Sequence, residues 1–248
     1  MTLLYEFLIT LFWPAAAAVS LAVAVGGDEV TAFGLVLLAC GTMSGYGLDR
    51  LMDRKDRDPP SFRRQLRNAV VLTSLIAFAC ACTSWWRFEI SCLLGVLAGG
   101  YVPLKRMVPK NWLTVSGWTI AVTCLPFAAA PDFTDRHHAA WIAVALIMFT
   151  NTTLCDLNSV EEDRRNGVRG VAPYFGVRIA AMICDVSASL AVGIAAYHQH
   201  PGLTACAAVL VPLAVYLGRN PKNRTAHTLV DLAITLIPGP VTVLVGLF

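Results

Sequence analysis

The sequence has little charge for its length. Only 14% of its 248 residues are Asp, Glu, Lys or Arg, whereas 56% are hydrophobic. Soluble domains carry about 25% charged residues and rarely expose large apolar patches to water. The mean hydropathy of +0.63 therefore predicts an integral membrane protein. The net charge of +3 is too small to indicate a nucleic-acid partner.

The sequence also lacks the patterns of a zinc or disulfide protein. It has no CxxC pair and no histidines at ligand spacing, and each cysteine lies inside or at the edge of an apolar stretch. Small apolar side chains of this kind are common in packed interiors. We therefore expect the cysteines to be free and to have no functional role. The eight cysteines are Cys40, Cys80, Cys82, Cys92, Cys124, Cys155, Cys184 and Cys206.

Long apolar runs fill most of the chain. A membrane-spanning helix needs about 17 to 25 apolar residues, and nine segments of the sequence approach this requirement. They lie at 7–26, 30–49, 67–86, 88–104, 112–131, 139–157, 175–197, 202–218 and 226–248. We therefore predict an all-α, multi-pass membrane bundle of about nine helices that forms a single domain over residues 1–248. The sequence indicates no oligomeric state.

The basic residues test this segmentation, because Lys and Arg collect in cytoplasmic loops. Of the 19 Lys and Arg residues, 17 follow the second, fourth, sixth and eighth predicted helices. Only Arg87 and Arg136 fall on the other side. This pattern predicts a multi-pass protein of an inner, cytoplasmic membrane, with its N-terminus and its two long polar loops in the cytoplasm.

Acidic residues are spaced regularly where these two loops begin. Asp49 and Asp53 are four residues apart, and Asp156 and Asp163 are seven apart, so each pair shares one face of a continuous helix. Carboxylates bind Mg²⁺, which is readily shared with phosphate oxygens, and nearby Arg and Lys neutralise the remaining phosphate charge. A diphosphate ligand in a membrane suggests an isoprenyl diphosphate. The alternative is that these acids are solvated helix ends.

Three motifs resemble those of the UbiA family of intramembrane prenyltransferases. The run DRLMDR at 49–54 resembles the end of that family's first aspartate-rich motif, NDxxDxxxD, and the run at 156–167 resembles its DxxDxEGDRxxG motif. Between them, YVPLKR at 101–106 is similar to its YxxxK element. The resemblance implies a helical bundle in which the two motifs hold Mg²⁺. The prenyl group would pass from its diphosphate to a lipophilic, aromatic or pigment acceptor.

The resemblance also implies roles for individual residues. Asp49, Asp53, Asp156 and Asp163 would be metal ligands, and together with Lys105 they form the predicted catalytic set. Tyr101 lies one turn before Lys105, so both can face a diphosphate leaving group. The alternative for these two is an interfacial tyrosine and a lysine that reaches the membrane surface. The predicted substrate-binding residues are Tyr101, Lys105, Arg63 and Arg164, although Arg54, Arg57, Arg64 and Arg67 are rivals to Arg63.

Four positions depart from the family's motifs. Gly45 and Tyr46 stand where the first motif usually has Asn and Asp, so two oxygen ligands are lost. In the second motif, Ser159 replaces a common aspartate and Glu162 replaces the glycine. Ser159 is itself similar to chlorophyll synthase-type members. These departures leave two alternatives to a transferase, namely a terpene cyclase of the same fold and a non-catalytic isoprenoid-binding protein.

Two further acids, Asp185 and Asp231, lie within predicted spans. Acids inside a membrane are functional candidates by default because isolated burial is costly. Polar neighbours could equally satisfy both carboxyl groups within the bundle.

Overall fold

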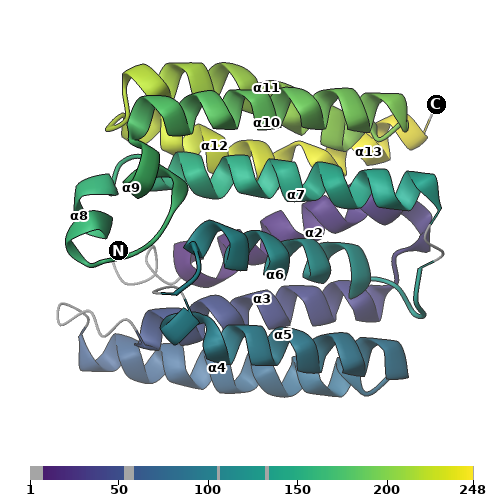
Figure 1. The fold of residues 1–248 in the computed structure, drawn as a ribbon. Coiled ribbons are helices and arrows are strands. Elements are labelled where there is room, and N and C mark those ends of the chain that lie inside the picture. Colours follow the sequence, from purple (N-terminus) through teal and green to yellow (C-terminus); the bar gives the residue numbers. More distant parts are fainter. Residues whose placement is uncertain (1–7, 53–58, 105–106, 132–133, 248) are drawn as a thin grey trace.

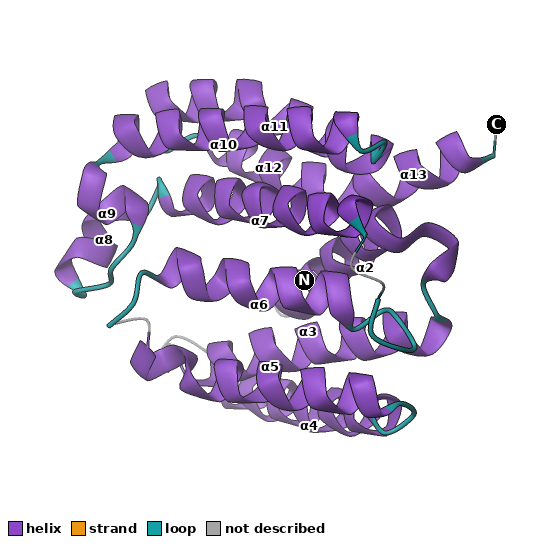
Figure 2. Cartoon of the chain, turned by 45° about the vertical axis from the view of Figure 1, so that its right-hand side comes forward, coloured by secondary structure: helices purple, strands orange, loops and turns teal. Residues whose placement is uncertain are grey.

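The computed structural model describes residues 8–52, 59–104, 107–131 and 134–247. These residues form helices joined by loops, with no β-strand among them (Figure 2). The long helices run side by side along one common direction, and the short helices α8 and α9 lie at one end of them (Figure 1). The predicted all-α bundle is therefore confirmed.

The helices lie in two stretches of the described chain, the first before residue 105 and the second after residue 106. The first run contains η1 (Leu8–Phe12), α2 (Trp13–Gly26), η2 (Gly27–Glu29), α3 (Ala32–Met52), α4 (Pro60–Ala81) and α5 (Trp85–Leu104). The second contains α6 (Lys110–Cys124), α7 (Asp135–Asp156), α8 (Val160–Arg165), α9 (Val171–Phe175), α10 (Val177–Tyr197), α11 (Pro201–Arg219), α12 (Arg224–Leu236) and α13 (Pro238–Gly246). In Figure 1, α4 and α5 form one edge of the bundle and α10 and α11 form the opposite edge.

All nine predicted spans fall on these helices, with corrections at several ends. The span at 226–248 divides into α12 and α13 at Pro238, because proline lacks the N–H that continues a helix. α4 begins at Pro60, seven residues before the predicted start, because proline fits the first turn of a helix. α6 ends at Cys124, earlier than the predicted end at residue 131.

Six helical segments of the described chain are long and apolar enough to cross a membrane. They are Thr10–Glu29, Ala32–Met52, Asp135–Asp156, Val177–Tyr197, Pro201–Arg219 and Arg224–Gly246. Two of the other long helices are shorter or more polar. α6 has 15 residues, and α4 carries three arginines in its first two turns.

Small side chains let the helices approach one another closely. Much of the buried core is alanine, particularly on α2, α7 and α10. At Gly34, an added Cβ would lie 2.2 Å from the carbonyl oxygen of Pro126. At Gly202, it would lie 2.0 Å from that of Pro238. Membrane helices associate through this kind of close packing, because lipid supplies no hydrophobic drive between them.

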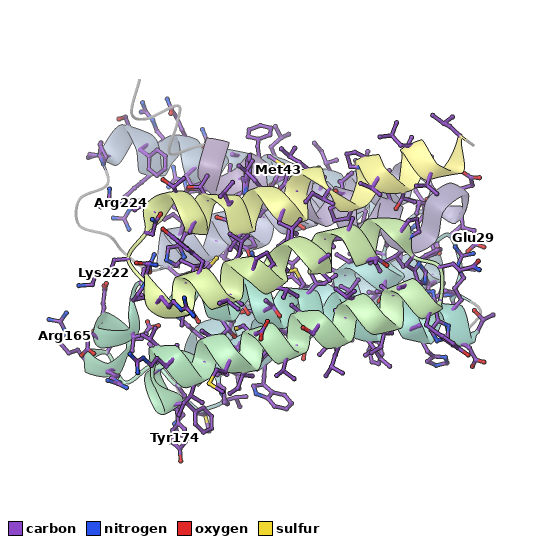
Figure 3. The ribbon with its side chains drawn as sticks, turned by 90° about the horizontal axis from the view of Figure 1, so that it is seen from above. Glu29, Met43, Arg165, Tyr174, Lys222 and Arg224 are labelled. Atoms are coloured by element: carbon purple, nitrogen blue, oxygen red, sulfur yellow. The ribbon has the colours of Figure 1, made fainter. Side chains whose placement is uncertain are left out.

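The outer surface of the bundle is apolar, and its two ends differ in charge. Large hydrophobic side chains such as Phe78 and Met182 are more than 60% exposed, as expected of residues that face lipid. Figure 3 places Arg165, Lys222 and Arg224 at one end of the molecule and Glu29 at the other. The charge asymmetry read from the sequence is therefore present in three dimensions.

Arg87 lies at the end opposite the basic loops. Because it is buried, it adds little to the surface charge of that end. Its side chain is 3% exposed. Its guanidinium donates to the carbonyl oxygen of Phe127 at 3.0 Å and to the hydroxyls of Thr83 and Thr31. Arg87 is thus enclosed by internal hydrogen-bond acceptors from three loops or helix ends.

Candidate active site

The two aspartates of the second motif are joined by one lysine. The Lys110 ammonium donates to Asp156 Oδ1 at 2.9 Å and to Asp163 Oδ2 at 2.7 Å. All three side chains are largely buried, with exposed fractions between 14% and 18%. Charge-assisted hydrogen bonds of this length are among the stronger ones in proteins. The two aspartates therefore lie close together. The residue that joins them, Lys110, is not part of the predicted motifs.

Lys110 is the first residue of α6 and precedes the apolar part of that helix. Burial by itself lowers the pKa of Lys110, but the attraction of Asp156 and Asp163 outweighs it. The pKa of Lys110 is therefore above its ordinary value. Lys110 consequently carries a full positive charge between the two carboxylates at neutral pH.

The neighbouring Asn111 fixes the same arrangement from a second side. Its side chain is 1% exposed, and its Nδ2 atom donates to Asp156 Oδ2 and to Thr153 Oγ1, each at 3.2 Å. Its Oδ1 atom accepts the backbone N–H of Val171 at 3.3 Å. Asn111 therefore ties the end of α7 to the start of α9.

The sequence prediction that Asp156 and Asp163 share one continuous helix is wrong. α7 ends at Asp156, and a turn separates it from α8, which begins at Val160. At this turn the backbone N–H groups of Leu157 and Ser159 bond to carbonyl oxygens three residues back, at Leu154 and Asp156, so the α-helical hydrogen-bond pattern of α7 stops there. Figure 1 shows α8 beside α9, at the end of the bundle where α7 ends.

The first motif lies at the end of α3. Asp49 is half-buried in the last turn of this helix, whereas Asp53 falls outside the described residues. A Cβ added at Gly45 would meet no heavy atom within 4 Å. There is therefore room at the position where the family's motif carries an asparagine.

Tyr46 connects the first-motif helix with the interior around the second motif. Its hydroxyl accepts the indole N–H of Trp118 on α6 at 3.1 Å, and the two rings meet edge to face with centroids 6.2 Å apart. The same hydroxyl lies within electrostatic range of Tyr101, Cys155 and Asp231. Since Cys155 directly precedes Asp156, Tyr46 of α3 lies near the end of α7, although 38% of its surface is exposed.

The predicted substrate-binding residues have different surroundings. Tyr101 lies on α5 near Tyr46, and Lys105 is outside the described residues. Arg63 is half-buried on α4, whereas its rivals Arg64 and Arg67 are exposed. All three arginines lie on α4, which begins at Pro60.

Arg164 has a local role in the structure. Its Nε atom donates to the carbonyl oxygen of Pro173 at 2.9 Å, and its Nη1 atom lies 3.4 Å from Glu161. Arg164 thus ties α8 to α9. Its use in binding a substrate stays a prediction.

The two intramembrane acids differ. Asp231 accepts weak hydrogen bonds from Asn151 at 3.5 Å and from the Cys155 thiol at 3.6 Å, so it joins α12 to α7 near the second motif. Asp185 instead lines a surface groove of about 300 Å³ between α10 and α11. Only Asp231 therefore belongs to the surroundings of the candidate site.

A family model described as the UbiA prenyltransferase family matches residues 11–229. The chain belongs to the UbiA prenyltransferase family. No curated protein matches it significantly. The fold agrees with a UbiA homolog from Aeropyrum pernix K1, at 17% identity and a TM-score of 0.68, over 97% of this chain and 98% of that one.

A second solved relative adds a bound ligand. A UbiA homolog from Archaeoglobus fulgidus, bound to GPP and Mg²⁺, is similar at 16% identity and a TM-score of 0.59. The match covers 96% of this chain and 99% of that one. The same homolog bound to DMAPP and Mg²⁺ gives a TM-score of 0.59 at 15% identity. At this level of identity these likenesses establish the shared UbiA fold.

The residue that sequence analysis missed in this site is Lys110. It was counted only among the basic residues that follow the fourth predicted helix. The one available signal was its position beside Asn111, a polar pair that opens an apolar run. Nothing in that pair indicates that its side chains reach Asp156, 45 or more residues further along the chain.

Proposed function

We propose that this protein is a Mg²⁺-dependent intramembrane prenyltransferase. It would transfer a prenyl group from an isoprenyl diphosphate to a lipophilic acceptor. The observation that carries the proposal is the Asp156–Lys110–Asp163 cluster in a family member that spans the membrane. Membership of the UbiA family and the relatives bound to GPP or DMAPP with Mg²⁺ support it.

The donor set suits a magnesium ion that is shared with a diphosphate. Asp156 and Asp163 accept a single ammonium between them, so their oxygens can converge on one cation. Among the described residues, no group of three or more His, Cys, Asp or Glu side chains could hold a metal alone. Magnesium commonly binds through one or two carboxylates plus substrate phosphates. Asp156 and Asp163 are the residues that would hold it together with phosphate oxygens, and Asp49 and Asp53 stay predicted ligands of the first motif.

The remaining residues of the site suit the chemistry of prenyl transfer. Bound Mg²⁺ would neutralise the charge that builds up on the departing diphosphate. Lys110 supplies a further positive charge at the same place. Breaking the carbon–oxygen bond leaves an allylic cation, which the electron-rich acceptor captures with loss of a proton. The ring faces of Tyr46 and Trp118 can stabilise such a cation by cation–π contact.

The decisive test of this function is transfer of label from radioactive geranyl diphosphate into lipid-soluble product by the purified chain. We expect product with Mg²⁺ and none after chelation, because the diphosphate would lose its neutralising ion. Supplying extracted membrane lipid as the source of acceptor avoids prior choice of that molecule. Tight binding of geranyl diphosphate without any product would instead favour the non-catalytic alternative that Gly45 and Tyr46 suggest.

We also propose that the end bearing Arg165, Lys222 and Arg224 faces the cytoplasm, because cytoplasmic ends are rich in Lys and Arg. In a variant without the eight native cysteines, an impermeant thiol reagent added to intact cells should label Glu29→Cys. It should leave Lys222→Cys unlabelled until the membrane is opened. The reverse pattern would place the site on the outer face and refute the orientation.

A further inference from the structure

Both oxygens of Asp156 are engaged in the structure. Asn111 Nδ2 lies 3.2 Å from Oδ2, and the Lys110 ammonium lies 2.9 Å from Oδ1. A metal ion that binds this carboxylate competes with these donors for its electron density, and its positive charge repels the ammonium beside it. Lys110 holds Asp163 in the same way, at 2.7 Å. The question is therefore which donor leaves.

The two donors differ in how firmly they are held. Asn111 is 1% exposed and is fixed by Thr153 and by the backbone of Val171 in addition to Asp156. Lys110 contacts the two aspartates through the end of a flexible four-carbon side chain. It is the donor that can move without disturbing α7 or α9.

We propose that Lys110 is an exchangeable counter-ion that competes with Mg²⁺ for Asp156 and Asp163. This inference rests on the proposed function and adds a rule for the order of binding. Mg²⁺ alone must break two charge-assisted hydrogen bonds and leave a largely buried ammonium without acceptors. A diphosphate that arrives with Mg²⁺ supplies new oxygen acceptors to that ammonium. The metal therefore binds weakly by itself and tightly together with diphosphate.

The competition can be measured with Mn²⁺, because its free fraction is read directly from the electron paramagnetic resonance spectrum. We expect the purified full-length chain to bind Mn²⁺ weakly without diphosphate. Lys110→Met should bind it roughly 10- to 100-fold more tightly, the range that corresponds to one charge-assisted hydrogen bond. Lys110→Gln removes the charge but keeps a polar end, and it should show the same gain in Mn²⁺ affinity. It serves as the second variant if Lys110→Met does not fold.

Two controls assign the gain to this site. Lys222→Met removes the same charge at the same end of the molecule (Figure 3), outside the described ion pairs of Asp156 and Asp163, and should leave Mn²⁺ affinity unchanged. Adding Asp156→Asn to Lys110→Met should abolish the gained affinity. Tight Mn²⁺ binding that persists in the double variant, or an equal gain in Lys222→Met, would overturn the inference.

A second measurement separates this inference from the proposed function. Geranyl diphosphate is titrated into the parent chain with Mn²⁺ present, and the release or uptake of Mn²⁺ is followed. If Mn²⁺ and geranyl diphosphate bind together but Lys110→Met does not change the affinity for Mn²⁺ alone, the proposed competition is wrong and the proposed function stands. Absence of any geranyl diphosphate binding would refute the function itself.

Discussion

Replacing either Asp156 or Asp163 by Asn should lower prenyl transfer by roughly 100- to 1000-fold, the scale of losing one strong electrostatic stabiliser at a reacting centre. Asn keeps the shape of the side chain but removes the negative charge that would hold Mg²⁺. It also weakens the pairing with Lys110, which lies within 2.9 Å of both carboxylates. The measurement is kcat/KM for geranyl diphosphate at saturating Mg²⁺.

Glu162→Gln is the matched control for this prediction. It removes the same kind of charge within the same motif, but Glu162 is an exposed side chain on α8. We expect activity within about twofold of the parent, because exposed charges of this kind contribute little energy. Equal losses in Glu162→Gln and Asp163→Asn would mean that the motif acts through its overall charge. Parental activity in both aspartate variants would limit these acids to a structural ion pair with Lys110.

The main architecture could be predicted from the sequence because lipid imposes a simple rule. A spanning segment must satisfy its own backbone hydrogen bonds, so long apolar runs become helices. The placement of Lys and Arg then predicts which ends of the helices face the cytoplasm. Helix ends were less predictable, because they depend on local chemistry. Pro60 extends α4 toward the site, and Pro238 divides the last span into two helices.

The candidate site could be predicted only in part, for a similar reason. Regular spacing identified Asp156 and Asp163, but it assumed one helix where the chain turns after Asp156 and begins a second helix at Val160. The bridge through Lys110 depends on the path of α6 relative to α7. That path is set by packing between distant segments, which periodicity does not report. Charge counts could not separate Lys110 from the other basic residues near it.

The position of the second motif depends on Asn111 as much as on its own aspartates. Replacing Asn111 by Leu keeps the approximate volume but removes the donor and acceptor that join Asp156, Thr153 and Val171. We expect a lower melting temperature, since a buried N–H or hydroxyl left without a partner costs about 1–3 kcal/mol. We also expect prenyl transfer to fall by roughly 10- to 100-fold, because misplacement of a site by about 1 Å can have that effect.

Asn220→Leu supplies the control, since Asn220 is exposed and its side chain donates one weak hydrogen bond, at 3.4 Å, to the carbonyl oxygen of Tyr216. It should change neither melting temperature nor activity appreciably. A positioning role for Asn111 further predicts that lowering the assay temperature well below the melting point will not restore transfer, because the Asp156 carboxylate stays misplaced in the folded protein. Full recovery of activity at low temperature would show that Asn111 acts on stability alone.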